Sequence, residues 1–144
     1  MYVERTFTVT KPIEVVFDHL SDFTNTTEWD PGTVATTRIS GEGGPGTRYA
    51  NTSQFMGRRV ELTYETITHQ RPERLQFRGR NKSAIATDTL GFTAEGPETT
   101  RINYRADFEF GVLVGLVAPF VVKPKLGALA DETVEQMQRC LNAL

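Results

Sequence analysis

Apolar and polar residues alternate along most of this chain, which is the pattern of β-strands with one buried and one solvated face. Arg101–Phe110 is the clearest case, because every second residue from Ile102 to Phe110 is apolar. Short segments rich in Gly, Pro and Asn separate most of the alternating stretches and predict tight turns. Seven strands in an antiparallel meander are therefore expected, at Tyr2–Val9, Thr33–Ile39, Thr47–Phe55, Arg59–Thr68, Leu75–Arg80, Ala84–Thr93 and Arg101–Phe110.

The segment from Thr10 to Pro31 has a different period. Its apolar residues fall at i, i+3, i+4 and i+7, which predicts one face of an amphipathic helix, made by Ile13, Val16, Phe17 and Leu20. Pro12 suits the first position of such a helix, where its missing N–H has no partner to lose. The polar residues after Leu20 break the helix and restart it before Trp29, so two short helices are expected after the first strand.

The last segment again has a helical period, with apolar positions from Leu126 to Leu144. Pro124 is a start point or a kink, so the helix is expected to begin near Lys125. Long strands with one apolar face need a cover, and this helix supplies it. The sequence thus predicts a single α+β domain, residues 1–144, in which a curved sheet wraps around the terminal helix and leaves a gap between them.

Bulk composition excludes several classes of function. A formal net charge of −2, with acidic and basic residues interspersed, gives no basis for expecting nucleic acid as a partner. Cys140 is the only cysteine, so neither an intrachain disulfide nor a cysteine cluster for a metal can form. The two histidines, His19 and His69, have no metal-ligand spacing and are expected to face solvent. We expect no metal and no cofactor, and we expect Cys140 to be a buried, inert thiol.

The glycines of Gly41–Gly46 could in principle cradle a phosphate. A phosphate-binding P-loop, however, has its glycines followed by Lys and Ser or Thr at the start of a helix. Here the glycines precede a predicted strand, so a hairpin loop is the interpretation.

The longest apolar run, 110–122, has thirteen residues with two glycines and a proline. It is too short to cross a hydrocarbon core of about 30 Å, and the first residues lack the apolar core of a signal peptide. A cytoplasmic protein without stable membrane insertion is expected. The run is predicted to be a loop before the last helix. It either gates a cavity, docks a partner chain or simply packs under the helix. Homodimer formation stays open.

Strand alternation also predicts which polar groups enter the interior. If Leu90 and Phe92 point inward, so does Asp88, and a carboxyl beside apolar walls has a raised pKa and can exchange protons. Tyr64 and Tyr104 could donate phenolic protons, so these three are the candidate catalytic residues. The candidate ligand-binding residues are Trp29, Leu62, Tyr64, Phe77, Asp88, Leu90, Tyr104, Phe108, Leu113 and Met137.

Several short motifs together resemble the polyketide cyclase/dehydrase branch of the START-like (SRPBCC) superfamily, over nearly the whole chain. They are Pro12–Phe17 with Leu20–Phe23, Glu28–Gly32, Gly44–Tyr49, Arg71–Leu75 and Thr99–Tyr104. The resemblance implies the helix-grip fold. It selects no reaction, since such a family holds aromatase/cyclases, lipid carriers and receptors alike.

Three functions are therefore weighed. The leading hypothesis is binding, and possible transport, of a small hydrophobic or lipid-like ligand in the gap, because the predicted inward face is mostly apolar. An alternative is a cofactor-free polyketide cyclase, aromatase or dehydratase that uses Asp88, Tyr64 and Tyr104. A second alternative is a protein-binding module that uses the 110–122 loop. The pattern alone fixes neither the ligand nor the strand register.

Overall fold

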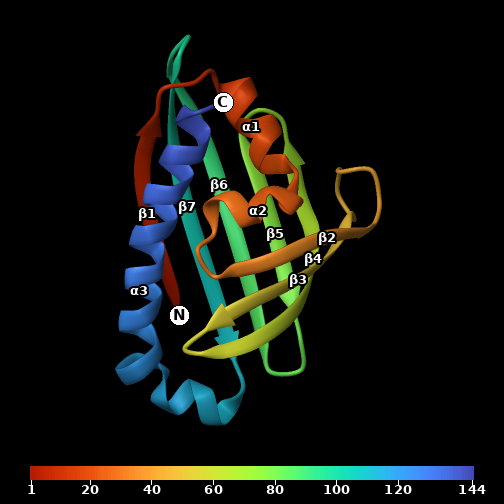
Figure 1. Ribbon diagram of the computed structural model, residues 1–144, viewed down its shortest axis with the longest axis vertical. Coiled ribbons are helices and arrows are strands. Elements are labelled where there is room, and N and C mark those ends of the chain that lie inside the picture. The colour runs from red at the N-terminus through yellow and green to blue at the C-terminus, as the bar shows by residue number, and fades with distance from the viewer.

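Seven antiparallel strands form one curved sheet in the order β1-β7-β6-β5-β4-β3-β2, and the long helix α3 runs over β1 and β7 at one side of its concave face (Figure 1). The structure, a computed structural model, describes the backbone of the whole chain and the side chains of residues 1–111 and 122–144. The strands are β1 (Tyr2–Val9), β2 (Thr33–Ser40), β3 (Arg48–Phe55), β4 (Arg58–Gln70), β5 (Arg74–Arg80), β6 (Ala84–Gly96) and β7 (Thr99–Phe110). The helices are α1 (Ile13–Ser21), the 3-10 turn η1 (Phe23–Asn25), α2 (Thr26–Trp29) and α3 (Val112–Asn142).

The predicted fold class is confirmed, because the meander, the two short helices after the first strand and the terminal helix are all present. β1 closes the order by pairing with β7, with Val3 opposite Ala106 and Phe7 opposite Ile102. β6 and β7 pair over almost their whole length. Since partners across an antiparallel ladder share a face, this register places the inward residues of β1, β6 and β7 in common rows.

The short helices close one end of the concave face. α1 buries Val16, Phe17 and Leu20 completely, as its apolar stripe predicts, and Pro12 is the residue just before its first turn. The Asp22 carboxylate accepts the backbone N–H of Thr24 at 3.0 Å, which caps η1. This cap sets the turn that brings the buried rings of η1 and α2 over the sheet.

An aromatic cluster fills the space between these helices and the sheet. The Phe23 ring lies at its centre, with centroid distances of 4.5 Å to Phe77, 4.6 Å to Tyr64, 5.7 Å to Tyr49 and 6.4 Å to Trp29. Tilted and edge-on ring contacts of this kind are favourable beyond the apolar area that they bury. The cluster therefore fixes how Tyr64 lies within the site described below.

The β2–β3 connection is the hairpin loop that its glycines predict. Gly41, Gly43 and Gly46 have positive φ angles, which only glycine adopts at little cost. The Thr47 hydroxyl accepts the N–H of Gly43 at 2.8 Å. Nothing in this loop opens a helix, so the interpretation as a turn holds.

The start of the last helix was predicted wrongly. α3 begins at Val112, not near Lys125, so the backbone of the predicted 110–122 loop belongs largely to the helix. Pro124 lies inside it and causes no break in the assigned helix. The side chains of residues 112–121 lie outside the described ones, and with them the hypothesis of a gate or docking loop. Among the described residues, no helix has the length and apolar character needed to cross a bilayer.

Candidate functional site

A buried carboxyl and a phenol form a hydrogen-bonded pair on the concave face. Asp88 comes from β6 and Tyr104 from β7, and Leu90, two residues after Asp88, is the register partner of Tyr104. The two polar side chains are thus diagonal neighbours on one face, within reach of a long side chain. The Tyr104 hydroxyl donates to Asp88 Oδ1 at 3.3 Å. Strand alternation predicted the inward direction of both residues, and the structure adds that they meet.

Burial raises the pKa of Asp88 to about 7. The main cause is loss of solvation of the charged form, and the negative charge of Asp30 adds to it. The hydrogen bond from Tyr104 acts in the opposite direction, because it stabilises the carboxylate. A carboxyl with this pKa exchanges its proton near neutral pH, as either donor or acceptor.

Tyr64 and Tyr104 remain protonated, because burial, followed by the charge of Asp88, raises the pKa of each phenol well above its usual range. Asp30 lies close enough to influence all three groups. Its own pKa is raised by burial, against the hydrogen bonds that it accepts from Thr33 at 2.7 Å and from the N–H of Gly32 at 3.1 Å. Sequence reasoning missed Asp30, since it lies beyond α2 and outside any strand pattern.

Trp29 is buried against Tyr104. It is 1 % exposed, and its ring meets the Tyr104 ring edge-on at a centroid distance of 6.3 Å. The indole N–H is buried and has no hydrogen-bond partner among the described residues. Buried polar groups are rarely left unpaired, so this N–H is an exception among the described residues.

Tyr64 fits against a strand that carries no side chain at that point. Its register partner on β5 is Gly79, and a Cβ built there would lie 2.6 Å from two carbon atoms of the Tyr64 ring. Phe23 holds the ring at a centroid distance of 4.6 Å, so the ring cannot move aside freely. The glycine thus permits Tyr64 to lie flat on the concave face.

The three polar residues of the site are not completely buried. Asp88, Tyr64 and Tyr104 each keep 8 % of their surface accessible and Ala86 keeps 6 %, whereas Leu90 on β6 and Leu75 and Phe77 on the neighbouring β5 are completely buried. The neighbouring positions 84, 86 and 106 on β6 and β7 carry only the small side chain of alanine.

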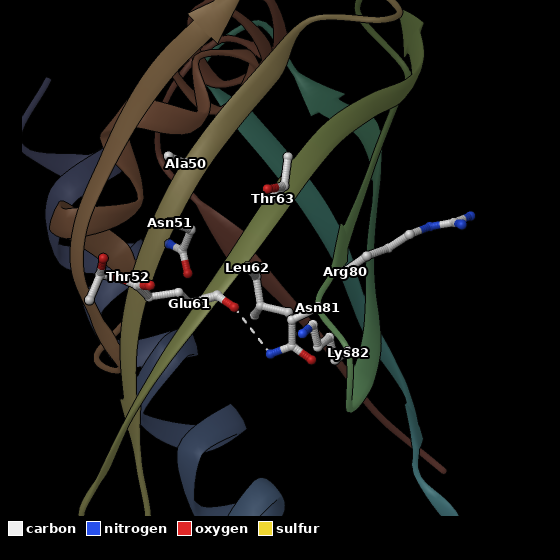
Figure 2. Close-up of a pocket in the computed structure, with 9 residues that line it drawn as sticks. All are labelled: Ala50, Asn51, Thr52, Glu61, Leu62, Thr63, Arg80, Asn81 and Lys82. Atoms are coloured by element: carbon white, nitrogen blue, oxygen red, sulfur yellow. Dashed lines mark hydrogen bonds between the residues drawn. The ribbon is translucent and has the colours of Figure 1, made fainter.

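Among the described residues, neither of the two most prominent pockets is lined by Asp88, Tyr64 or Tyr104. The first, of about 400 Å³, opens where β4 separates from the β5–β6 turn (Figure 2). The Asn81 side-chain amide donates to the Glu61 carbonyl across this gap at 3.1 Å. The pocket is lined by Ala50, Asn51, Thr52, Glu61, Leu62, Thr63, Arg80, Asn81 and Lys82. The second, of about 700 Å³, lies between β1 and α3, near Arg5 and Lys123.

The other candidate ligand-binding residues fall into three groups. Phe77, Leu90 and Met137 are fully buried and form the core. Leu62 and Phe108 are partly buried at the edge of that core, and Leu62 also lines the first pocket. Leu113 lies outside the residues whose side chains are described. Leu62, Phe108 and the Asp88–Tyr104 pair therefore remain the main candidates for contact with a ligand.

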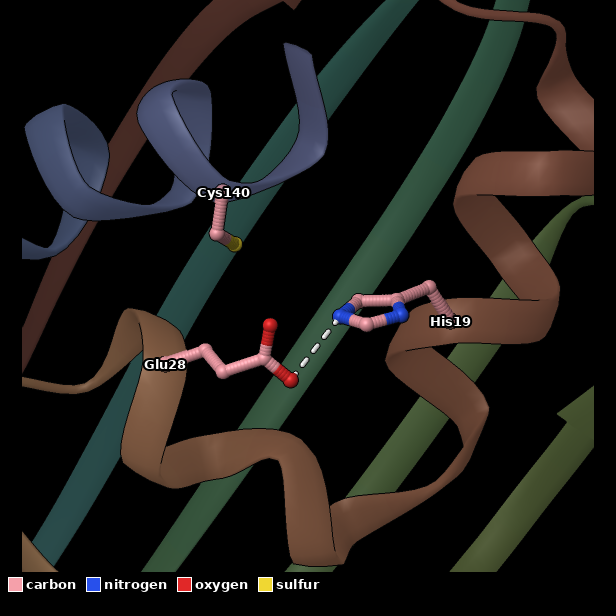
Figure 3. Close-up of side chains that lie close together, drawn as sticks. All are labelled: His19, Glu28 and Cys140. Carbon is pink, nitrogen blue, oxygen red and sulfur yellow. Dashed lines mark ion pairs between the residues drawn. The ribbon is translucent and has the colours of Figure 1, made fainter. Parts of the chain in front are cut away.

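Both histidines were wrongly expected to face solvent. The His69 ring packs edge-on against Phe17 at a centroid distance of 5.0 Å. The side chain of His19 is only 18 % exposed, and its Nε2 lies 3.3 Å from Glu28 Oε2 (Figure 3). Cys140 of α3 lies beside this pair, with the three potential ligand atoms all within 4.8 Å of one another. Burial raises the pKa of the Cys140 thiol to about 11, and the charge of Glu28 adds to the effect.

Comparisons with known proteins agree with this architecture. A family model described as polyketide cyclase/dehydrase and lipid transport matches residues 2–141. No curated protein matches the sequence significantly.

Solved structures show the same fold at low identity. A protein from Thermus thermophilus is 18 % identical, with a TM-score of 0.83 over 99 % of this chain and 98 % of its own. A START superfamily protein from Mycobacterium smegmatis is 17 % identical, with a TM-score of 0.75 over 99 % and 94 %. The Zhui aromatase/cyclase from a Streptomyces species is also 17 % identical, with a TM-score of 0.77 over 99 % and 92 %. At such identities the likeness concerns the fold.

Proposed function

The chain belongs to the polyketide cyclase/dehydrase and lipid transport family, and we propose that it binds a small, mostly apolar molecule with an oxygen-bearing group on the concave face of the sheet. The observation that carries the proposal is the Asp88–Tyr104 pair, a buried carboxyl and phenol that are hydrogen-bonded to each other among the apolar side chains of the core. Ligand sites in proteins combine such apolar walls with a few placed polar groups. The Asp88 carboxyl in its protonated form and the Tyr104 hydroxyl are donors for a ligand carbonyl or hydroxyl.

The binding experiment uses 2-naphthol as a flat aromatic probe and palmitate as a lipid probe, each added to the full chain and followed by native mass spectrometry. We expect the wild type to retain one molecule of at least one probe. Asp88→Leu, which keeps the bulk and removes the donor, should weaken 2-naphthol binding about tenfold, because a hydrogen bond is worth up to about 1.5 kcal/mol. Tyr104→Phe should weaken it to a similar extent.

Tyr2→Phe is the matched control, because Tyr2 is half exposed on β1 and its ring packs under the Arg105 guanidinium. This variant should bind the probes as the wild type does. Retention of neither probe by the wild type, or equal affinities in the wild type and Asp88→Leu, would contradict the proposal.

A second function, proton-transfer catalysis on a bound polyketide-like substrate, is favoured by one observation. The pKa of Asp88 near 7 suits a general acid or base at neutral pH, and the Tyr104 phenol beside it can relay or donate a proton. Cyclisation of such a substrate would need only a surface that holds it in the reactive conformation, together with Asp88 and Tyr104. This candidate rests on the same site and adds turnover to binding.

Turnover is tested with a poly-β-ketone thioester analogue, with products separated by chromatography. Asp88→Asn should lower the rate of cyclisation at least about 100-fold, and the pH–rate profile of the wild type should inflect near 7. Probe binding measured on the same variant separates lost chemistry from lost affinity. A rate no higher than in buffer, or an unchanged rate in Asp88→Asn, leaves ligand binding as the function.

A further inference from the structure

The second chemical cluster of the molecule lies where its three helices meet. Figure 3 shows His19 of α1, Glu28 of α2 and Cys140 near the end of α3 turned toward a common point. None of these residues belongs to the Asp88–Tyr104 site. Their positions in the sequence gave no metal signal, because the fold, not local spacing, brings them together.

The spacing of the three potential ligand atoms fits a single small cation. His19 Nε2 and Glu28 Oε2 are 3.3 Å apart, and both lie within 4.8 Å of Cys140 Sγ. Around a tetrahedral Zn²⁺, with bonds of about 2.0–2.3 Å, nitrogen, oxygen and sulfur ligands stand roughly 3.3–3.6 Å from one another. Small rotations of the Glu28 and Cys140 side chains are enough to reach that geometry.

Ordinary hydrogen bonding does not account for the cluster. His19 Nε2 is buried and makes no hydrogen bond of acceptable geometry with any described residue, despite its closeness to Glu28. The Cys140 thiol has one weak partner, the Met137 carbonyl at 3.5 Å. The backbone beneath His19 is fixed, since the Asn25 amide donates to the His19 carbonyl at 2.9 Å. A buried nitrogen with only an ion-pair contact, beside a thiol with one weak partner, leaves ligand atoms that a metal ion could use.

We propose that His19, Glu28 and Cys140 bind one Zn²⁺ ion, with water as the fourth ligand. Thiolate, imidazole and carboxylate together suit zinc better than magnesium or calcium, which prefer oxygen ligands alone. Glu28 is 44 % exposed in its side chain, which leaves that side open to water. On binding, the thiol proton passes to solvent and the ion joins α1 and α2 to the end of α3. The three short segments that cover the sheet are thereby tied together.

The test is a titration of the metal-free full chain with Co²⁺, which takes zinc sites and reports its ligands by absorption. We expect one equivalent to bind, with a thiolate-to-cobalt charge-transfer band, and Zn²⁺ to displace it. Cys140→Ser should abolish the band and weaken binding at least about 100-fold, since even the loss of an outer-shell partner costs 10–100-fold. His19→Gln should weaken binding comparably and shift the visible cobalt bands.

His69→Gln is the matched control, because the other histidine packs on Phe17 away from the cluster and should leave the titration unchanged. Thermal unfolding with and without Zn²⁺ provides a readout that needs no variant: the wild type should melt higher with the ion. Absence of a thiolate band in the wild type, or binding to Cys140→Ser as tight as to the wild type, would overturn the proposal.

Discussion

Asp88→Asn should make the folded protein more stable at pH 8, by about 4 kcal/mol relative to the wild type at that pH. Folding raises the pKa of the carboxyl from its ordinary 3.8 to about 7, and a tenfold change in proton affinity corresponds to about 1.4 kcal/mol. Above pH 7 the wild type must keep a charge where burial disfavours it. Asparagine has the same shape, carries no charge and still accepts the Tyr104 hydrogen bond.

The sign of the pH dependence follows from proton linkage. Between about pH 4 and pH 7 the folded state holds the Asp88 proton and the unfolded state does not, so wild-type stability falls as pH rises through this window. Below about pH 4 both states are protonated and the two proteins should converge.

Chemical denaturation near pH 4 and at pH 8 measures the difference, with Glu109→Gln on the exposed side of β7 as the control that should follow the wild type. Equal stability of Asp88→Asn and the wild type at pH 8 would contradict a buried, neutral carboxyl.

Phe23→Ala should lower the free energy of unfolding by about 3–5 kcal/mol, the usual cost of deleting a buried phenylalanine ring. Phe23 is 2 % exposed and contacts four other aromatic rings, so its loss leaves a cavity that rigid neighbours cannot fill. Because the ring presses Tyr64 against Gly79, the variant should also weaken binding of the aromatic probe.

Phe110→Ala is the control for this prediction. Phe110 is partly buried at the end of β7 and stacks on Phe108 with a centroid distance of 6.0 Å. Urea unfolding should show a clearly smaller loss for Phe110→Ala than for Phe23→Ala. Similar losses in both variants would mean that the aromatic cluster has no special part in the core.

Much of the fold was predictable because the strands obey a simple period. Alternation around Leu90 placed Asp88 on the inner face, and the same reasoning placed Tyr64 and Tyr104 there. The hydrogen bond between Asp88 and Tyr104 was not predictable, because it depends on the register of β6 against β7, which alternation leaves undetermined. The residue pattern within each strand thus predicts the fold, whereas the site also depends on how neighbouring strands pair.

The helical regions were predicted less well, for identifiable reasons. Gly111 and Pro124 suggested a loop before the last helix, yet the assigned helix includes Pro124, so local propensity did not decide its start. His19 lies off the apolar stripe of α1, which predicted exposure. It is covered because α2 and the end of α3 pack on that side, where Glu28 and Cys140 meet it. Contacts between elements far apart in the chain produce no periodic pattern in the sequence, so they could not be predicted from it.

We claim, above all, that the concave face holds a carboxyl that gains and loses its proton near neutral pH and is available to a ligand. The most direct measurement is a pH titration of the Asp88 carboxyl carbon by NMR in the labelled protein, without and with bound 2-naphthol. We expect the titration of the Asp88 carboxyl to have its midpoint near pH 7 in the free protein, and we expect its resonance to shift when the probe binds. A midpoint near 4, with a resonance that ignores the probe, would contradict it.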